Sequence, residues 1–143
     1  MTATTLTSTN VDLARQFLLG HNQPNYLVVH EATLAPDAIV HEYLPGLPSS
    51  LDRAGYAQFI AMFRASLPDV QNTILEVIDA GDRVVIRWTG SGTHTGEPLI
   101  GIPAAGKPVQ AHGIYIMRFV GGRIAEVWNH WDNLNVVQQL GGM

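Results

Sequence analysis

The order of two hydrophobic periodicities along the chain constrains the fold more than any other sequence feature. Apolar residues recur at helical spacing mainly in the first half, and they alternate at strand spacing mainly in the second half. Because helices precede strands, the sequence predicts an α+β protein with an antiparallel sheet rather than interleaved β-α units. The predicted helices cover residues 10–19, 24–31 and 50–66, with a short one before Gly141, and the predicted strands cover 38–43, 73–78, 83–93, 109–119 and 123–131.

The chain of 143 residues is expected to form one domain, residues 1–143, with a sizeable buried core. Hydrophobic residues make up 46% and charged residues only 14%, whereas about a quarter of an average domain is charged. This deficit indicates that the protein hides much of its surface in a lined cavity, an oligomer interface or both. The first nine residues, five of them Thr, are expected to be a flexible lead-in.

Composition excludes several classes of function. The net charge is −4 and no basic run is present, so we expect no nucleic-acid binding. The chain has no Cys, which excludes disulfides and thiolate ligands, and its histidines lack a metal-binding spacing. We therefore expect no metal site. No apolar run is long enough to span a bilayer, which predicts a cytoplasmic protein that does not associate with membranes.

The segment Trp128-Asn129-His130-Trp131-Asp132 is the strongest functional signal, because it sets one carboxylate beside two indoles. Apolar surroundings raise the pKa of a carboxyl group toward neutrality, which allows an Asp to act as acid or base. Strand alternation places Asp132 on one face with Trp128 and His130, and the neighbouring strand could bring His112 close. The alternatives are structural, since Asp132 could cap the C-terminal helix and His112 could bond to a backbone carbonyl.

Other pocket candidates are histidines, an arginine and aromatic residues. His41 follows the apolar run 38–40 and could be a core histidine, a ligand-bonding group or an exposed side chain. His94 lies in a Gly-flanked segment that also suits a tight structural loop. Arg87 could face a substrate or simply pair with Glu76. The aromatic residues that would form apolar walls, where they face inward, are Trp88, Trp128, Tyr43, Phe59 and Phe63.

Several short motifs are jointly informative, although none is specific alone. In chain order they are GDRVVIRW at 81–88, GTHTG at 92–96, GIPAAGK at 101–107, RF at 118–119, GRIAEVW at 122–128, Asp132 and QLG at 139–141. Together they resemble the SnoaL-like polyketide cyclase family over roughly residues 10–141. The resemblance implies the nuclear-transport-factor-2-like fold, in which a cone of helices is closed by a strongly curved antiparallel sheet around a cavity.

The resemblance also implies an activity. In polyketide cyclases of this family, a cavity Asp acts as acid and base in an intramolecular aldol ring closure without metal or cofactor. The matching residue is Asp132, and the family's pocket histidines match His41 and His112, either of which could hydrogen-bond the developing enolate. The chain is thus expected to cyclise or isomerise a hydrophobic, polyketide-like small molecule.

Two other functions fit the same resemblance. Epoxide hydrolases of this fold use an Asp-Arg-Asp set, for which Arg87 or Arg118 could supply the arginine, and a dehydratase or isomerase is the related alternative. The domain could instead bind a ligand without catalysis. Sparse charge further predicts a homodimer or higher oligomer formed through the outer face of the sheet.

Overall fold

The computed structural model describes residues 9–142 and contains, within them, four helices and six strands. The helices are α1 (Thr9–Gly20), α2 (Tyr26–Thr33), α3 (Arg53–Ser66) and α4 (Asn133–Leu140). The strands are β1 (Leu34–Glu42), β2 (Ser50–Leu51), β3 (Gln71–Asp79), β4 (Arg83–Thr93), β5 (Pro108–Val120) and β6 (Arg123–Trp131). The predicted lead-in falls outside the described residues except for Thr9, which begins α1.

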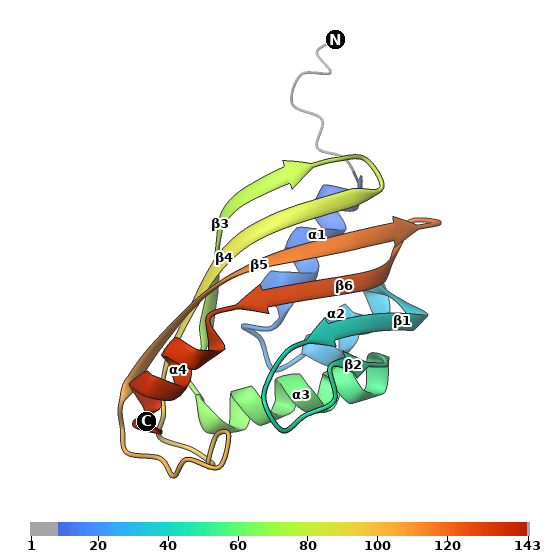
Figure 1. Ribbon diagram of the computed structural model, residues 1–143. Coiled ribbons are helices and arrows are strands. Elements are labelled where there is room, and N and C mark those ends of the chain that lie inside the picture. The colour runs from blue at the N-terminus through green and yellow to red at the C-terminus, as the bar shows by residue number, and fades with distance from the viewer. Residues whose placement is uncertain (1–8, 143) are drawn as a thin grey trace.

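The strands form one sheet in the order β2-β1-β6-β5-β4-β3. The sheet is strongly curved, with α1, α2 and α3 covering its concave face and α4 lying at one end (Figure 1). The predicted α+β architecture is therefore confirmed. The apolar stripes of these helices are buried against the sheet that the second half of the chain mostly builds.

One pairing differs from the expected antiparallel sheet. Strand β1 runs parallel to β6, with His41 opposite Trp128 and Glu42 opposite Asn129. The other pairings of neighbouring strands are antiparallel. Periodicity identifies a strand but not the direction of its partner, and no hairpin links β1 to β6. The parallel register brings Glu42 and Asn129 side by side.

Helix α3 begins later than its predicted start at Ser50. Ser50 and Leu51 instead pair with β1 as strand β2, and Asp52 becomes the N-cap. The Asp52 side chain accepts a hydrogen bond from the Gly55 amide at 2.7 Å, an interaction that typically stabilises a helix by about 1 kcal/mol. From this start, α3 buries Tyr56, Phe59, Ile60 and Ser66.

The concave face of the sheet and the helices enclose the hydrophobic core. Phe17 of α1 and Tyr56 of α3 are fully buried, and their rings stack with centroids 5.8 Å apart. Burying a Phe side chain contributes roughly 1.5–3 kcal/mol. A smaller cluster near α4 consists of Leu67, Leu99, Val109, Val136 and Leu140. Residues of both clusters line one cavity between them.

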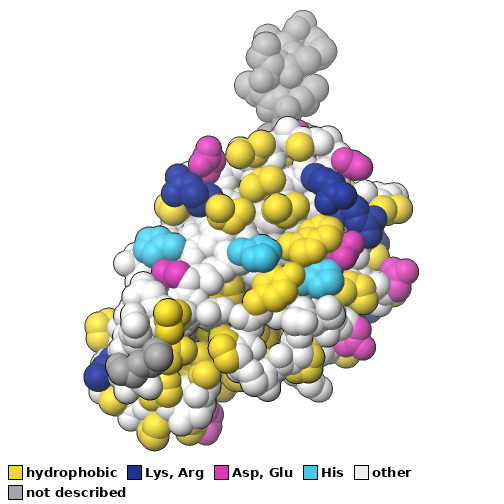
Figure 2. Space-filling model, in the orientation of Figure 1, with side chains coloured by type: hydrophobic (Ala, Val, Ile, Leu, Met, Phe, Trp, Pro, Cys, Tyr) yellow, Lys and Arg dark blue, Asp and Glu magenta, His cyan; other side chains and the backbone are white. Residues whose placement is uncertain are grey.

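The convex face of the sheet carries exposed hydrophobic side chains together with histidines (Figure 2). Ile39, Tyr43 and Ile114 are 39%, 41% and 44% exposed. The rings of Tyr43 and His130 stack there with centroids 4.8 Å apart. Contiguous apolar surface on a sheet face is typical of an interaction surface.

Candidate active site

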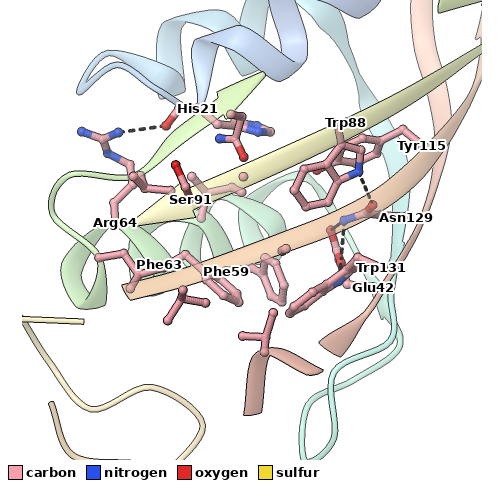
Figure 3. Close-up of a pocket in the computed structure, with 18 residues that line it drawn as sticks. His21, Glu42, Phe59, Phe63, Arg64, Trp88, Ser91, Tyr115, Asn129 and Trp131 are labelled. Atoms are coloured by element: carbon pink, nitrogen blue, oxygen red, sulfur yellow. Dashed lines mark hydrogen bonds between the residues drawn. The ribbon is translucent and has the colours of Figure 1, made fainter. Parts of the chain in front are cut away.

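A cavity opens between α3 and the concave face of the sheet (Figure 3). The empty space in the cavity and its open mouth together amounts to about 680 Å3. Most of its wall is apolar. The lining residues are His21, Glu42, Phe59, Ile60, Phe63, Arg64, Leu67, Val70, Asn72, Trp88, Gly90, Ser91, Val109, Ala111, Tyr115, Asn129, Trp131 and Val136.

Glu42 is the one carboxylate among these lining residues. It is the last residue of β1, where alternation places Ala38, Val40 and Glu42 on the same inward face. Ala38 and Val40 are completely buried, and Glu42 is only 1% exposed. The strand face that packs against the core therefore also carries a carboxyl group into the cavity.

Three side-chain contacts orient this carboxyl group. Asn129 Nδ2 lies 2.9 Å from Glu42 Oε2 and 3.1 Å from Oε1, and the Trp131 indole N–H donates to Oε1 at 3.0 Å. On the other side of the amide, Trp88 donates to Asn129 Oδ1 at 3.2 Å. Because an indole N–H can only donate, the Trp88 contact turns the amide NH2 group toward Glu42.

Burial raises the pKa of the Glu42 carboxyl from its ordinary value of 4.5 to about 8. The hydrogen bonds from Asn129 and Trp131 lower the pKa, because they favour the ionised form, but the effect of burial is larger. A carboxyl group that titrates near neutral pH can both take and return a proton. Oε1 accepts two of the hydrogen bonds and Oε2 one, so Oε2 retains more capacity to meet a substrate proton.

Tyr115 adds a hydroxyl group to the same wall. It lies on β5 opposite Asn129 of β6, and its hydroxyl oxygen is 3.3 Å from that of Tyr56. Burial raises the pKa of both phenols, so both keep their protons at neutral pH. Tyr56 is completely buried and has no other side-chain hydrogen bond within residues 9–142. Its O–H therefore donates to Tyr115, which leaves the Tyr115 hydrogen free to meet a ligand.

Gly113 allows the Trp88 indole to reach Asn129. It pairs with Trp88 across β4–β5 and with Trp131 across β5–β6. A Cβ atom at position 113 would lie 2.7 Å from Trp88 Nε1 and 2.8 Å from Trp131 Cβ. Both distances are too short for non-bonded atoms, so any side chain at this position would displace the indole that holds Asn129.

Asp132 lies outside this cavity, in a depression on the convex side of the sheet. Its Oδ1 accepts the His112 amide at 2.9 Å and its Oδ2 accepts the Asn135 side chain at 3.1 Å. Its side chain makes no capping hydrogen bond to α4. The expectation that Asp132 lies in the cavity is therefore wrong. Strand alternation turns Trp131 inward and Asp132 outward. Since Trp128 faces outward as well, hydrophobicity could not distinguish the two faces of β6.

The two histidines expected to assist Asp132 also lie on the convex side. His112 is exposed, and it meets Asp132 through its backbone amide rather than its ring. Both ring nitrogens of His41 have partners outside the cavity, one of them Glu126 at 2.7 Å. The His41 ring stacks on Trp128 with centroids 5.4 Å apart. The structure therefore brings neither imidazole to the cavity.

Three of the expected wall residues line the cavity: Trp88, Phe59 and Phe63. Phe59 and Phe63 lie one turn apart on α3, with ring centroids separated by 5.0 Å. Phe63 also meets Trp131 edge to face at 5.8 Å. These aromatic rings, inclined to one another by 48° and 78°, form an apolar part of the cavity wall.

The other two expected wall residues, Tyr43 and Trp128, and the pocket candidates Arg87 and His94 lie elsewhere. Tyr43 and Trp128 face the convex side, where each stacks on a histidine. Arg87 is exposed and forms an ion pair, so its charge remains in water. His94 is buried in the loop after β4, where its Nε2 lies 2.8 Å from the Glu97 carbonyl oxygen. Arg87 thus pairs with Glu76, and His94 has a structural role in its loop, as the alternatives to pocket roles proposed.

Sequence reasoning did not identify Glu42 as the cavity carboxyl. A signal was present, because Glu42 is a lone carboxylate in phase with Ala38 and Val40 on an otherwise apolar strand face. Asn129 and Tyr115 had no comparable signal, since their role depends on the partners that the sheet register gives them.

The described residues show no preformed metal site or membrane helix. Within residues 9–142, no group of three or more His, Cys, Asp or Glu side chains is placed to hold a metal ion. The buried histidines His21 and His30 bond to each other, with their Nε2 atoms 2.9 Å apart. No helix in the same range is long and apolar enough to cross a membrane.

Asn129→Ala tests the network around Glu42. We expect the pKa of Glu42 to rise further, because the lost hydrogen bond favours the ionised carboxylate. We also expect the free energy of unfolding to fall by about 1–3 kcal/mol, because the Trp88 N–H loses its acceptor. Carbon-13 NMR of the Glu carboxyl groups measures the first effect and urea denaturation the second. The control is Asn135→Ala on α4, which should leave the Glu42 titration unchanged. A lowered Glu42 pKa in Asn129→Ala would contradict the assignment.

A curved sheet closed by helices around an apolar cavity, with one buried carboxyl group in its wall, defines a class of α+β proteins that bind small molecules. The chain belongs to the SnoaL-like polyketide cyclase family, whose model matches residues 14–140. No curated protein matches the chain.

Solved structures agree with the family assignment. IdmH from Streptomyces antibioticus, a candidate polyketide cyclase, is 27% identical over 94% of this chain and 99% of its own, with a TM-score of 0.79. A candidate polyketide cyclase from Acidithiobacillus ferrooxidans is 29% identical over 99% of both chains, with a TM-score of 0.77. An NTF2-like protein of unknown function from Burkholderia pseudomallei is 19% identical over 94% of this chain and 98% of its own, with a TM-score of 0.77, and it supports the fold alone. The expected nuclear-transport-factor-2-like fold is confirmed.

Proposed function

We propose that this protein is a cofactor-independent acid-base enzyme that cyclises or isomerises a hydrophobic, polyketide-like small molecule, with Glu42 as the proton-transferring group. The observation that carries the proposal is a carboxyl group 1% exposed, with a pKa of about 8, in the wall of an apolar cavity. Family membership supports the substrate class. The cytoplasmic location stays a prediction.

In the proposed reaction, ionised Glu42 removes a proton from the carbon next to a substrate carbonyl. The C–H electron pair becomes the C=C bond of the enolate while the carbonyl π pair moves to the oxygen, and the Tyr115 O–H donates to that enolate oxygen. The enolate carbon then attacks a second carbonyl of the same molecule, which forms the C–C bond and leaves an alkoxide. Protonated Glu42 returns its proton to the alkoxide. In an isomerisation, the same proton returns to a different carbon.

No observation favours the epoxide hydrolase alternative. The described cavity lining contains one carboxylate, Glu42, and one guanidinium, Arg64, but no Asp. The two arginines considered from the sequence, Arg87 and Arg118, form ion pairs with glutamates outside the cavity. An Asp-Arg-Asp set is therefore not assembled among the residues of this lining.

The proposal is tested with 2-tetralone, an apolar bicyclic ketone whose α-protons are acidic. In D2O, proton NMR follows the loss of the α-proton signals. We expect the protein to accelerate this exchange above the rate in buffer at the same pH, with saturation as the ketone concentration rises. Trp88 and Trp131 line the cavity, so quenching of tryptophan fluorescence checks that the ketone binds. Binding without acceleration would contradict the proposed proton transfer.

We also propose that two copies associate through the convex face of the sheet, where Ile39, Tyr43 and Ile114 are exposed. Ile114→Arg should convert the dimer to a monomer, because a charge buried in the interface is costly to desolvate. Light scattering coupled to size exclusion measures the mass. The control is Val28→Arg, since Val28 is 64% exposed on helix α2, away from this face. A wild-type protein that is monomeric at micromolar concentration would rule out the dimer.

A further inference from the structure

The cavity has a second polar end, separate from the one that holds Glu42. In Figure 3, Arg64 and His21 lie at one end, while Glu42, Asn129 and Trp131 lie at the other. Arg64 lies on α3, and His21 directly follows α1. The proposed acid-base reaction uses neither residue.

Arg64 brings a positive charge to this wall. Its Nη1 donates to the His21 carbonyl oxygen at 2.8 Å, and its guanidinium carbon lies 5.8 Å from the centre of the Tyr26 ring. No carboxylate of residues 9–142 forms an ion pair with it. A guanidinium group has five N–H donors in a planar fork, so most of them remain available. A half-buried cation in an apolar cavity is stabilised when an anion binds to it.

The His21 ring adds a neutral donor beside Arg64. Its Nε2 lies 2.9 Å from Nε2 of His30, and His30 Nδ1 is the only buried side-chain nitrogen or oxygen without a partner in the described part of the chain. A bare acceptor is tolerated in that position better than an unpaired N–H. His30 therefore carries its hydrogen on Nε2 and donates to His21.

This assignment fixes the tautomer of His21. Because its Nε2 accepts, a neutral His21 carries its hydrogen on Nδ1. Burial, followed by the charges of His30 and Arg64, lowers the pKa of His21, so the ring is neutral at pH 7. His21 Nδ1 has no hydrogen-bond partner within residues 9–142, and it is not fully buried. His21 also lines the cavity. Its N–H is thus presented to a ligand.

We propose that Arg64 and His21 form a carboxylate subsite, and that the substrate is a hydrophobic keto acid whose carboxylate binds there while its reacting carbonyl lies at Glu42. The inference rests on the proposed function for the placement of the carbonyl. One guanidinium balances one negative charge, and its fork matches the two oxygens of a carboxylate. A phosphate dianion would leave uncompensated charge in an apolar cavity. The rings of Phe59 and Phe63 lie in the wall between the two ends and suit an apolar substrate body (Figure 3).

The test compares two probes of nearly the same shape, 2-naphthoate and the neutral ketone 2-acetylnaphthalene. Dissociation constants are measured at pH 7 by isothermal titration calorimetry on the full chain. We expect the wild type to bind 2-naphthoate at least tenfold more tightly than the ketone. Arg64→Gln should weaken naphthoate binding by about 10- to 100-fold, because charge-assisted hydrogen bonds are lost. The same variant should leave the ketone affinity within about twofold, and Arg64→Lys should retain part of the preference because it keeps the charge without the fork.

Because the ratio of the two constants is taken within one protein preparation, a partly unfolded variant does not distort it. Equal affinity of the wild type for both probes would overturn the carboxylate subsite, as would an equal loss of both affinities in Arg64→Gln. Glu42→Gln should keep the preference for naphthoate. If the protein does not accelerate 2-tetralone exchange but still prefers naphthoate, the proposed function is wrong and the carboxylate subsite is supported. If it accelerates the exchange but shows no preference for naphthoate, only the carboxylate subsite is wrong.

Discussion

Replacing Glu42 with Gln is expected to slow the protein-catalysed exchange of 2-tetralone by about 10²–10⁴-fold, the usual contribution of a positioned general base. The substitution preserves the shape of the side chain and leaves an amide oxygen that can still accept from Asn129 or Trp131. What it removes is the group that takes the proton. Rates are measured by proton NMR at equal concentrations of folded protein, with far-UV circular dichroism as the check on folding.

The pH dependence of the exchange rate provides a second readout for the same variant. Because the ionised carboxylate is the base and the pKa of Glu42 is about 8, the wild-type rate should rise up to that pH and then level off. Glu42→Gln should lack this rise. A merely structural role for Glu42 would lower the rate without removing the titration.

Asp132→Asn is the matched control, because this carboxylate lies on the convex side of the sheet and contacts the His112 amide and Asn135. We expect it to exchange 2-tetralone at the wild-type rate. The reverse outcome, with Asp132→Asn inactive and Glu42→Gln active, would restore the assignment made from the family resemblance and refute the role of Glu42.

The sequence predicted the elements of this fold well, because helices and strands leave local periodic signals. It predicted the two hairpins, β3–β4 and β5–β6, but not the pairing of β1, which lies parallel to β6 only through contacts between distant segments. The pairing of β1 with β6 determines which side chains meet in the candidate active site. Glu42 meets Asn129 across these two strands, and neither residue stands near the other in the chain.

Sequence reasoning chose the wrong face of β6 as the one that points into the cavity. Trp128 and Trp131 occupy opposite faces of one strand, so the hydrophobic pattern favours neither face. The choice is made by β5, whose inward residues Tyr115 and Met117 pair with Asn129 and Val127. Strand alternation was the right rule, but only packing against the helices could say which set of side chains pointed inward.

Burial of Glu42 should also make the stability of the fold depend on pH. The folded-state pKa is about 8, against an ordinary value of 4.5. Below pH 4.5 the carboxyl group is protonated in both states. Between these values the unfolded chain loses the proton while the native protein keeps it, so the free energy of unfolding falls as pH rises. The full effect is on the order of 5 kcal/mol.

The buried histidines His21 and His30 act in the opposite direction and in another range. Burial lowers the pKa of His21 and that of His30, the latter to about 4. Their unfolded forms bind protons below about pH 6.5, so their contribution to stability is lost as pH falls through that range. Between pH 4.5 and about 7 they oppose Glu42, and above about pH 7 the Glu42 effect dominates among these three groups.

Urea denaturation of the wild type at pH 6.5 and pH 8, at constant ionic strength, should therefore show a loss of about 1 kcal/mol in the free energy of unfolding, because the two histidines offset part of the Glu42 effect. Glu42→Gln has no proton to lose at this position, so its stability should not fall over the same interval. Glu76→Gln is the control, since Glu76 is exposed and pairs with Arg87, and it should behave as the wild type does. If wild type and Glu42→Gln lose equal stability, the carboxyl group is not held protonated, and the buried acid that the proposed reaction requires is absent.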